Sequence, residues 1–451
     1  MKAIEINIKK GLDLQIDGTP DFNRKKEVIP RKVALLGRDY PFLKPSFFVK
    51  EGESVKKGTP LFADKFHPEI IYTSPVSGVV DSINRGEKRR FLSIVITASG
   101  NEEITFNKYS REKIQNLSTD ELKTNLLKSG MWIALRNRPY GHVAHPSDKP
   151  YAIYITATDT TPHAVDPLMV IDQYENEFNA GVEILSRLTE GKCYVVTAKE
   201  SKSASCTKDN TLNVVAKGPH PSGNVGTHIH FLSPVSRTRN VWYAGYNDVI
   251  AIGHLFLTGK LLTEKVISVG GPASIEPQLV KTVSGVSLDE VVATMKQNGE
   301  VRVVSGSLLS GFKAEGEIAY LGRYHNQVSL IHEGRERFFL GWMAPGLNRF
   351  SAMRVFFSSL LPQKKYRFTT NKNGSRREMV PIGNYEKIFP FDILPVFLLR
   401  ALLMKNSEWA EEMGALELEE EDLSLCTFVS VGKEDFGELL RENLTILEQE
   451  G

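Results

Sequence analysis

Two short, turn-rich motifs in the first quarter of the chain constrain its fold more than any other feature. The first, residues 50–61, reads Lys-Glu-Gly-Glu-Ser-Val-Lys-Lys-Gly-Thr-Pro-Leu, and the second, residues 74–80, reads Ser-Pro-Val-Ser-Gly-Val-Val. Glycine and proline at such close spacing divide a chain into short strands and tight turns. Residues 1–105 are therefore predicted to consist of strands and turns.

The spacing of these motifs is that of a small barrel-sandwich domain, the biotinyl/lipoyl-like fold of cofactor carriers. A biotin carrier presents its modified lysine at a hairpin tip, between two methionines and shortly before the proline of the second motif. Here Phe66-His67-Pro68 occupies that place, and no Met-Lys-Met occurs in the sequence. A carrier fold without its attachment lysine indicates a domain kept for docking.

Length and composition indicate a folded protein of several domains. The chain has 451 residues, more than one hydrophobic core usually supports, and it is 41% hydrophobic and 24% charged. A formal net charge of +2 gives no overall attraction to nucleic acid, so no nucleic-acid partner is expected. Cys193, Cys206 and Cys426 are too few and too scattered for a disulfide framework or a four-cysteine iron–sulfur site.

The two most apolar stretches, residues 241–262 and 389–404, are predicted to pack in a core. Charged residues interrupt both, Asp248 in the first and Arg400 in the second. A membrane-spanning helix needs about 20 apolar residues with few charges, and neither stretch qualifies. Residues 1–8 alternate apolar and charged side chains as a strand does, so export is not expected.

Beyond residue 105 the pattern changes to alternating strands and helices. Residues 151–157 and 193–197 are apolar strands, and residues 167–189 between them carry apolar side chains at helical spacing. This order implies a βαβ unit and a parallel sheet, so residues 106–255 are predicted to form a Rossmann-like α/β domain. The Gly-x-Gly-x-x-Gly loop of dinucleotide-binding domains is absent after the first strand, and no nucleotide is expected to bind there.

The rest of the chain completes an α/β multidomain fold. Residues 256–330 are predicted to form a small α+β domain of ubiquitin-like, or SLBB, type, with a helix over residues 288–298. Residues 331–382 form a basic linker region, and residues 383–451 a largely helical, acidic C-terminal region. The basic residues from 364 to 377 fit anionic lipid headgroups, although a solvated surface loop is the commoner role of such a stretch.

The histidine-containing segment 220–231 is the sharpest candidate for chemistry. If residues 227–231 form a strand, His228 and His230 project from the same face. With His220 as a third ligand, they would chelate a transition metal, as in a zinc-type metallohydrolase. The favoured alternative is that the histidines order a glycine-rich loop by hydrogen bonding, because no further His, Asp or Glu at ligand spacing completes a metal site.

A second candidate is the cluster Trp132, Arg136, Arg138 and Tyr140. Aromatic faces and guanidinium donors suit a flat, oxygen-bearing ligand such as a quinone. The same residue types are enriched at protein interfaces, and contact with a partner is the preferred interpretation. The cluster is therefore predicted to contact either a quinone or a partner protein, and no residue of the chain is predicted to be catalytic.

Seven distinctive blocks follow one another along the chain. They are residues 9–14, 52–61, 136–139, 220–231, 339–342, 379–386 and 425–429. In this order the blocks resemble those of the A subunit of the bacterial sodium-translocating NADH:quinone oxidoreductase. The resemblance runs from about residue 5 to residue 445, almost the whole chain.

The resemblance implies a peripheral subunit on the cytoplasmic face of the bacterial inner membrane. It belongs there to a six-subunit respiratory translocase that passes electrons from NADH through FAD, FMN, riboflavin and iron–sulfur centres to ubiquinone or menaquinone, and exports sodium. The resemblance also implies that the chain binds no redox cofactor and docks, among the other five subunits, chiefly on the membrane-embedded B subunit near the quinone site. Two roles stay open, support of quinone reduction at that site and a purely structural adaptor.

Overall fold

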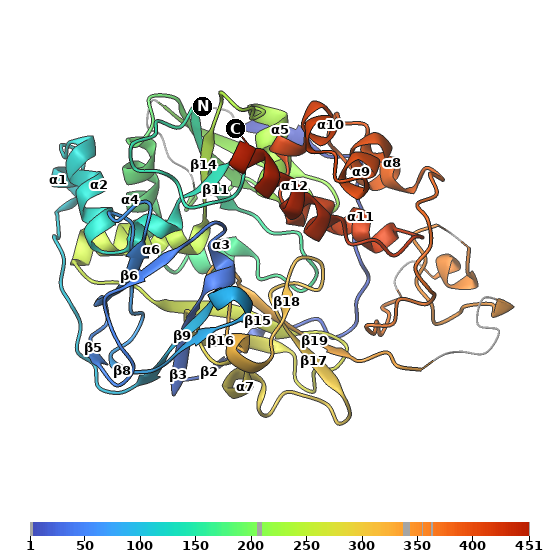
Figure 1. The fold of residues 1–451 in the computed structure, drawn as a ribbon, viewed down its shortest axis with the longest axis horizontal. Helices are drawn as coiled ribbons and strands as arrows, with labels where there is room; N and C mark the ends of the chain where they lie inside the picture. The colour runs from blue at the N-terminus through green and yellow to red at the C-terminus, as the bar shows by residue number, and fades with distance from the viewer. Residues whose placement is uncertain (1–2, 205–209, 337–342, 354, 362–363, 451) are drawn as a thin grey trace.

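Four β-sheets and a helical C-terminal region make up the part of the chain that the structure describes (Figure 1). This computed structural model describes residues 3–204, 210–336, 343–353, 355–361 and 364–450. Two of the sheets have six strands each, one has four and one has three. The combination of these sheets with helices after residue 383 agrees with the predicted α/β multidomain architecture.

The four-stranded and three-stranded sheets form the barrel-sandwich domain and share one aromatic core. Phe62 of the smaller sheet packs against Phe91 of the larger one, with ring centroids 5.3 Å apart, and it stacks on Tyr72 at 4.6 Å. All three side chains are buried. The larger sheet has the order β3 (Lys32–Leu36), β9 (Phe91–Ala98), β8 (Gly78–Arg85), β5 (Ser54–Val55), and the smaller one β4 (Pro45–Phe47), β6 (Pro60–Asp64), β7 (Ile71–Thr73).

The glycines of the two motifs have structural roles in this domain. Gly52 and Gly58 adopt φ values of 86° and 92°, in the left-handed region that favours glycine. A Cβ at Gly78 would meet the carbonyl oxygen of Thr97 on the neighbouring strand. At the tip between β6 and β7, where a carrier would hold its lysine, the His67 ring lies 4.0 Å from that of His145. The hairpin tip therefore docks on a loop of the same chain.

The first two strands leave the barrel-sandwich domain and join other sheets. β1 (Ile4–Asn7) pairs in parallel with β13 (Thr211–Lys217) of the α/β domain. β2 (Asp21–Glu27) pairs in parallel with β16 (Gln278–Val283) of the third domain. The N-terminal segment thus connects three sheets, which the alternating pattern of residues 1–8 alone does not reveal.

The α/β domain is built on a six-stranded sheet that is parallel except at one edge. That edge is β10 (Arg136–Arg138), which runs antiparallel to β14 (Val241–Gly245). The other strands follow in the order β14, β11 (Ala152–Ala157), β12 (Lys192–Thr197), β13, β1. The helices of this domain are α1 (Arg111–Ile114), α2 (Thr119–Lys128), α3 (Pro167–Ile171), α4 (Glu175–Ser186), α5 (Val225–Leu232) and α6 (Tyr246–Thr258).

The helix predicted over residues 167–189 is two helices, α3 and α4. The break lies at Tyr174, whose φ of −128° and ψ of 35° are not helical. Helix α4 packs closely on α6 because Gly181 and Gly253 face each other's helix, where a Cβ on either would meet backbone atoms. Residues 241–262 pack in the core as predicted, and no helix in the described ranges is long and apolar enough to cross a membrane.

The third domain has a mixed six-stranded sheet and a short helix, α7 (Leu288–Val292). This helix ends earlier than predicted because the following residues bond to another segment, with Ile275 N donating to the Met295 carbonyl at 2.8 Å. The buried core of the third domain includes Val269, Val291 and Leu330. The strand order is β18 (Phe312–Lys313), β17 (Val301–Ser305), β19 (Gln327–His332), β15 (Glu264–Gly270), β16, β2.

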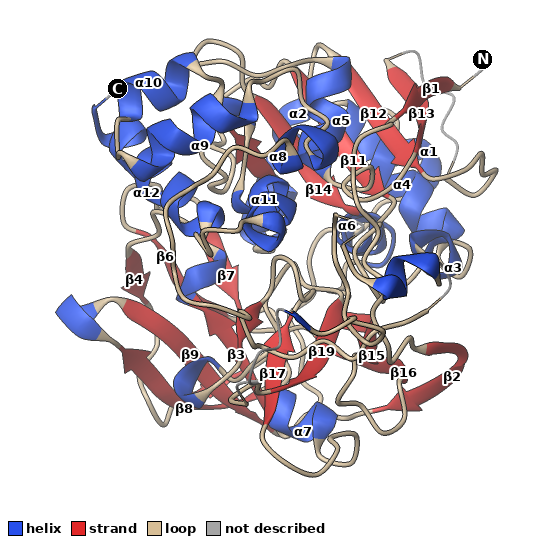
Figure 2. Cartoon of the chain, turned by 90° about the vertical axis from the view of Figure 1, so that its right-hand side faces the viewer, coloured by secondary structure: helices blue, strands red, loops and turns tan. Residues whose placement is uncertain are grey.

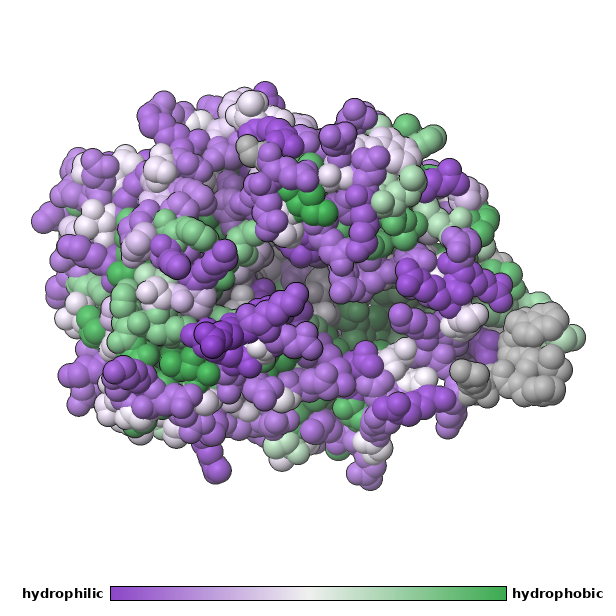
Figure 3. Space-filling view, in the orientation of Figure 1, coloured by the Kyte–Doolittle hydropathy of each residue, from purple (hydrophilic) through white to green (hydrophobic). Residues whose placement is uncertain are grey.

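The C-terminal helices pack around their own core, in which Leu398, Leu402, Leu440 and Leu444 are fully buried. Figure 2 shows these helices as a group beside the sheets. The segment that leads to them projects at the right-hand end of Figure 1, where apolar side chains reach the surface (Figure 3). The helices are α8 (Asn384–Ile388), α9 (Pro395–Leu403), α10 (Ser407–Glu412), α11 (Ser424–Val429) and α12 (Phe436–Glu450).

Candidate functional site

A cavity of about 730 Å³, including its opening, lies where the barrel-sandwich, α/β and third domains meet. Cavities at domain junctions are common places for small-molecule sites. The apolar side chains lining it include Leu35, Met131, Ile133, Leu261 and Leu321. Polar residues that also line it come from segments far apart in sequence: Asp39, Tyr40, Asp248, Lys265 and Arg323.

The charged side chains of the cavity are held by hydrogen bonds from several elements. Lys265 Nζ donates to the carbonyl oxygens of Arg323, at 2.6 Å, and His325, at 3.3 Å. An Arg323 guanidinium nitrogen lies 2.5 Å from Asp248 Oδ1 of α6. The Arg323 backbone N–H donates to Asp39 Oδ2 at 2.8 Å. This network joins the three domains at the cavity.

Burial shifts the two titratable groups of the network toward neutrality. Loss of water around Lys265, reinforced by the nearby charge of Arg323, lowers the pKa of its ammonium to about 7. Loss of water around Asp39 raises the pKa of its carboxyl to about 6, against the opposing hydrogen bond from Arg323. Groups with pKa values this close to neutral can exchange protons with a ligand at physiological pH.

The Tyr40 hydroxyl is buried and has no hydrogen-bond partner among the described residues. The Tyr40 ring itself is packed edge-on against Tyr72 and Tyr324, at centroid distances of 4.7 Å and 6.2 Å. A buried hydroxyl without a partner is destabilising. Tyr40 also lines the cavity, so a ligand oxygen that reached this hydroxyl would satisfy it.

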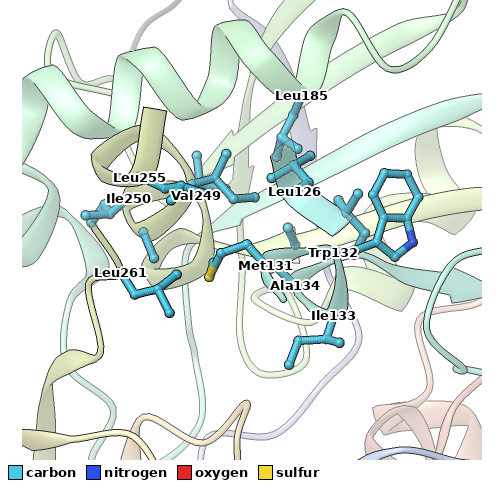
Figure 4. Packing of buried hydrophobic residues seen from close by; sticks show 14 of the residues in the cluster. Leu126, Met131, Trp132, Ile133, Ala134, Leu185, Val249, Ile250, Leu255 and Leu261 are labelled. Atoms are coloured by element: carbon cyan, nitrogen blue, oxygen red, sulfur yellow. The ribbon is translucent and has the colours of Figure 1, made fainter. Parts of the chain in front are cut away.

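Trp132, one of the four predicted contact residues, lies in the core behind the cavity wall. Met131 and Ile133, its neighbours on the 3-10 helix η3 (Met131–Ala134), line the cavity. In Figure 4 Met131 points toward Leu261, whereas the indole of Trp132 points away. That indole is fully buried, and its Nε1 donates to the Ala144 carbonyl at 2.6 Å. Trp132 thus fixes the segment that forms the wall.

Arg136, the second of these residues, lies one layer behind the cavity. Its guanidinium is sandwiched between the rings of Tyr243 and Tyr324, at 4.4 Å and 4.2 Å from their centroids. Tyr324 in turn packs against Tyr40, and its hydroxyl donates to the Ile133 carbonyl at 2.7 Å. Arg136 therefore reaches the cavity only through Tyr324.

Arg138, the third residue, joins the α/β domain to the C-terminal region. It is fully buried, and its Nη1 lies 2.7 Å from Asp422 Oδ2 and donates to the Glu417 carbonyl at 2.8 Å. Its Nε lies 3.3 Å from Glu419. Burial lowers the pKa of Arg138, but the attraction of Asp422 and Glu419 outweighs this effect and raises the pKa above its usual value.

Tyr140, the fourth residue, is half-buried and has a positive φ of 80°. Its carbonyl oxygen accepts a hydrogen bond from Arg441 of α12 at 2.5 Å. Residues 136–140 therefore run from the back of the cavity to the C-terminal helices. The prediction that the four residues contact a quinone or a partner stays a prediction, and the burial of Trp132 and Arg138 leaves Tyr140 as the most accessible of them.

The predicted strand over residues 227–231 is wrong, because these residues belong to helix α5. Side chains two positions apart on a helix do not face each other, so His228 and His230 diverge. His228 Nε2 lies 2.8 Å from the Ser222 carbonyl oxygen. His230 Nδ1 lies 2.8 Å from Glu417 Oε2, and its Nε2 accepts the Asp392 backbone N–H at 2.9 Å.

His220 lies apart from both, with its Nδ1 3.1 Å from Thr160 Oγ1. Burial lowers the pKa values of His220 and His228 to about 4. In the described part of the chain, no three His, Cys, Asp or Glu side chains are arranged to hold a metal ion. The metallohydrolase alternative is therefore unsupported, and the histidines act through hydrogen bonds.

The sequence did not lead to a prediction of the polar residues that converge on the cavity. Asp39, Tyr40, Lys265 and Arg323 share no local spacing, and only the folding of three domains brings them together. Of the three cysteines, Cys193 and Cys426 are buried, and neither lines the cavity. Cys206 and block 339–342 lie outside the described residues.

Family models match three parts of the chain. The NqrA N-terminal barrel-sandwich hybrid domain matches residues 6–99, and the NqrA second alpha/beta domain matches residues 117–261. The NQRA C-terminal domain, of SLBB type, matches residues 266–316. These matches confirm the predicted fold class, while the predicted domain boundaries stay predictions.

Two relatives align with almost the whole chain. The A subunit of the Na(+)-translocating NADH-quinone reductase of Cellvibrio japonicus is 47% identical, covering 99% of this chain and 100% of the relative. Its namesake from Vibrio anguillarum is 48% identical with the same coverage. A chain of an NAD+-reducing NiFe-hydrogenase in the air-oxidized state covers 75% of this chain and 69% of its own, at 13% identity and a TM-score of 0.39, which is too low to support an argument.

Proposed function

Since the chain belongs to the NqrA family, the A subunits of Na(+)-translocating NADH-quinone reductase, we propose that it is a peripheral component of a sodium-exporting NADH:quinone oxidoreductase. It docks on the membrane-embedded B subunit, on the cytoplasmic face of the inner membrane and near the quinone site, and supports reduction of ubiquinone or menaquinone. The flavins and iron–sulfur centres that carry the electrons belong to the other five subunits, and this chain binds no redox cofactor of its own.

The observation that supports a quinone role is the cavity at the junction of the three domains. A quinone is a flat ring with two acceptor oxygens and an apolar tail. The cavity offers apolar walls such as Met131 and Leu261, together with two buried donors, the Tyr40 hydroxyl and the Lys265 ammonium. An apolar pocket with a few convergent polar groups is the usual form of such a site.

In this proposal the four predicted contact residues hold the site in place. Trp132 supports η3 of the cavity wall, and Arg136 supports Tyr324, which contacts Ile133 and Tyr40 of that wall. Both therefore act as positioning residues. Arg138 holds the C-terminal region against the α/β sheet through Asp422. Tyr140 lies beside that junction and is the candidate for contact with a neighbouring subunit.

Replacing Lys265 with methionine tests the quinone role in the assembled complex. Lys265→Met keeps an unbranched side chain of similar length and removes the ammonium that would donate to a quinone oxygen. With its pKa lowered to about 7, Lys265 is charged in only part of the molecules at neutral pH. The loss of this donor should therefore raise the KM for quinone several-fold. The matched control is Lys260→Met, which removes an exposed lysine outside the cavity and should leave this KM unchanged.

The structural adaptor is the second candidate, and the observation that favours it is Tyr140, which is half-buried beside the junction with the C-terminal helices. The same experiment separates the two. If Lys265→Met complexes contain all subunits and show an unchanged KM and kcat for quinone, the cavity has no part in quinone binding. A loss of subunits from the purified complex, with normal KM in what remains assembled, would favour the adaptor.

A further inference from the structure

Exposed apolar side chains are concentrated in one region of the surface, residues 343–353, 355–361 and 364–382, here called the basic lobe. Nine of the 21 exposed large apolar residues in the described part of the chain lie in it. Leu360 is 76% exposed and Val355 is 69% exposed, so these side chains are presented to the outside. Concentrated apolar exposure of this kind marks an interaction surface. The nine residues are Met343, Leu347, Met353, Val355, Phe357, Leu360, Leu361, Val380 and Ile382.

The inner side of the basic lobe is anchored to the rest of the molecule. Phe350 packs against Tyr366 and Phe368, both at 5.6 Å between ring centroids, and against Phe428 of helix α11 at 5.9 Å. The Tyr366 backbone N–H donates to the Gln15 carbonyl at 2.8 Å. The lobe therefore has an aromatic core of its own, while nine of its apolar side chains stay exposed.

The basic lobe also carries a net positive charge. Residues 343–382 contain eight Lys or Arg residues and one acidic residue, Glu378, a net charge of +7 in a chain of +2. The remainder of the chain is therefore net acidic, at −5. An anionic surface would attract the lobe and repel the rest of the molecule, so charge alone favours one orientation.

Three cations of this region lie close together without a carboxylate partner. The Arg377 backbone N–H donates to the Gly432 carbonyl at 3.0 Å, which places Arg377 next to Lys433 in space. Burial, and then repulsion from the charges of Lys372 and Arg377, lowers the pKa of Lys433. Within the described ranges none of them forms an ion pair, whereas the adjacent Arg376 pairs with Glu434 at 2.6 Å. An anionic group placed among Lys372, Arg377 and Lys433 would relieve that repulsion.

We propose that the basic lobe lies on the anionic surface of a lipid bilayer. Its apolar side chains, foremost Phe357 and Leu360 of the 3-10 helix η6 (Phe357–Leu360), enter the boundary between headgroups and acyl chains. Its cations, foremost Lys372 and Arg377, contact the phosphate groups of the lipids. This contact is separate from the quinone cavity, and it holds the protein on the membrane in one orientation.

Sedimentation of the purified full chain with lipid vesicles tests this proposal. The chain should bind vesicles of phosphatidylcholine with phosphatidylglycerol, bind phosphatidylcholine alone weakly, and lose binding as salt is raised. The double variant Lys372→Glu with Arg377→Glu should weaken binding at least about tenfold, because two attractions become repulsions. Phe357→Ser with Leu360→Ser should weaken binding at every salt concentration, because it removes the inserted groups.

Matched control variants carry the same changes on exposed residues elsewhere. Lys50→Glu with Lys88→Glu, and Ile29→Ser with Ile275→Ser, should leave binding unchanged. Equal binding to both kinds of vesicle, equal loss in the controls, or no binding at all would overturn the proposal. So would variants of the lobe that bind vesicles normally but no longer co-purify with the other subunits, since the lobe would then be a protein contact. Unchanged melting temperatures exclude unfolding as the cause.

Discussion

At the scale of single residues, Arg138 shows how far the local sequence can guide prediction. Its closeness in sequence to Trp132 and Tyr140 led to the prediction of contact with a quinone or a partner, whereas in the structure Arg138 is buried and pairs within its own chain. The carboxylates that pair with Arg138 come from residues 419 and 422, which no local spacing connects to residue 138. A buried guanidinium needs such partners, because an unpaired buried charge is strongly unfavourable.

Replacing Arg138 with methionine should destabilise the purified chain by about 3–5 kcal/mol, because Glu419 and Asp422 would remain buried without a cation. The free energy of unfolding in urea measures this change. The control is Arg237→Met, which removes the exposed pair with Glu411 and should destabilise the chain much less than Arg138→Met does. Equal destabilisation by the two variants would show that the buried network adds no more than a surface pair.

At the scale of elements, the sequence predicted the positions of most strands and helices but misread helix α5. Thr227 and Ile229 are β-branched and alternate with histidines, a pattern typical of a strand. In the structure the segment is helical because its buried face, including Val225 and Ile229, packs against Tyr154 and Tyr243 of the sheet. The available signal was Asn224, a residue type favoured immediately before a helix.

Helix α5 also makes the stability of the chain depend on pH. Burial lowers the pKa of His228 to about 4, compared with 6.5 for an exposed histidine. The charge of Arg138 also lowers this pKa, whereas the hydrogen bond to the Ser222 carbonyl raises it. Between pH 6.5 and pH 4 the unfolded chain therefore binds a proton that the folded chain does not. Stability is complete above pH 6.5 and falls as the pH drops toward 4.

His228→Gln keeps an amide donor for the Ser222 carbonyl and removes the titrating ring. The free energy of unfolding of this variant should fall less steeply from pH 6.5 to pH 4. The slope of that free energy against pH should correspond to up to about one fewer proton taken up on unfolding. Urea unfolding at a series of pH values measures the slope. Above pH 7, where the imidazole is neutral in both states, the two proteins should show the same dependence. Parallel curves below pH 6.5 would contradict the assignment.

At the scale of the whole molecule, the functional candidate arises where domains meet. The family resemblance and the local patterns gave the order of the domains, but neither indicated the cavity between them. Its polar residues extend from Asp39 to Arg323, and the N-terminal strands β1 and β2 join sheets that lie far along the sequence. Such placements depend on tertiary packing, which no window of sequence contains.

Replacing Tyr40 at this junction is predicted to have two opposite effects, a gain in stability of the chain and a loss in quinone binding. Its buried hydroxyl lacks a partner among the described residues, so Tyr40→Phe should stabilise the isolated chain by about 1 kcal/mol. The same change removes a donor from the proposed quinone site, so the KM for quinone of the assembled complex should rise several-fold. Urea unfolding of the chain and steady-state kinetics of the complex measure the two effects.

Tyr385→Phe serves as the matched control, because its hydroxyl lies in the C-terminal region, 3.5 Å from Ser430 Oγ and outside the cavity. It should leave the quinone KM unchanged and should not stabilise the chain. If Tyr40→Phe stabilises the chain without changing the KM, the unpartnered hydroxyl is only a packing defect. If it destabilises the chain, the hydroxyl already has a partner, and the ligand-binding role of Tyr40 loses its main support. Only the combination of higher stability and weaker quinone use supports a site in which stability is given up for ligand binding.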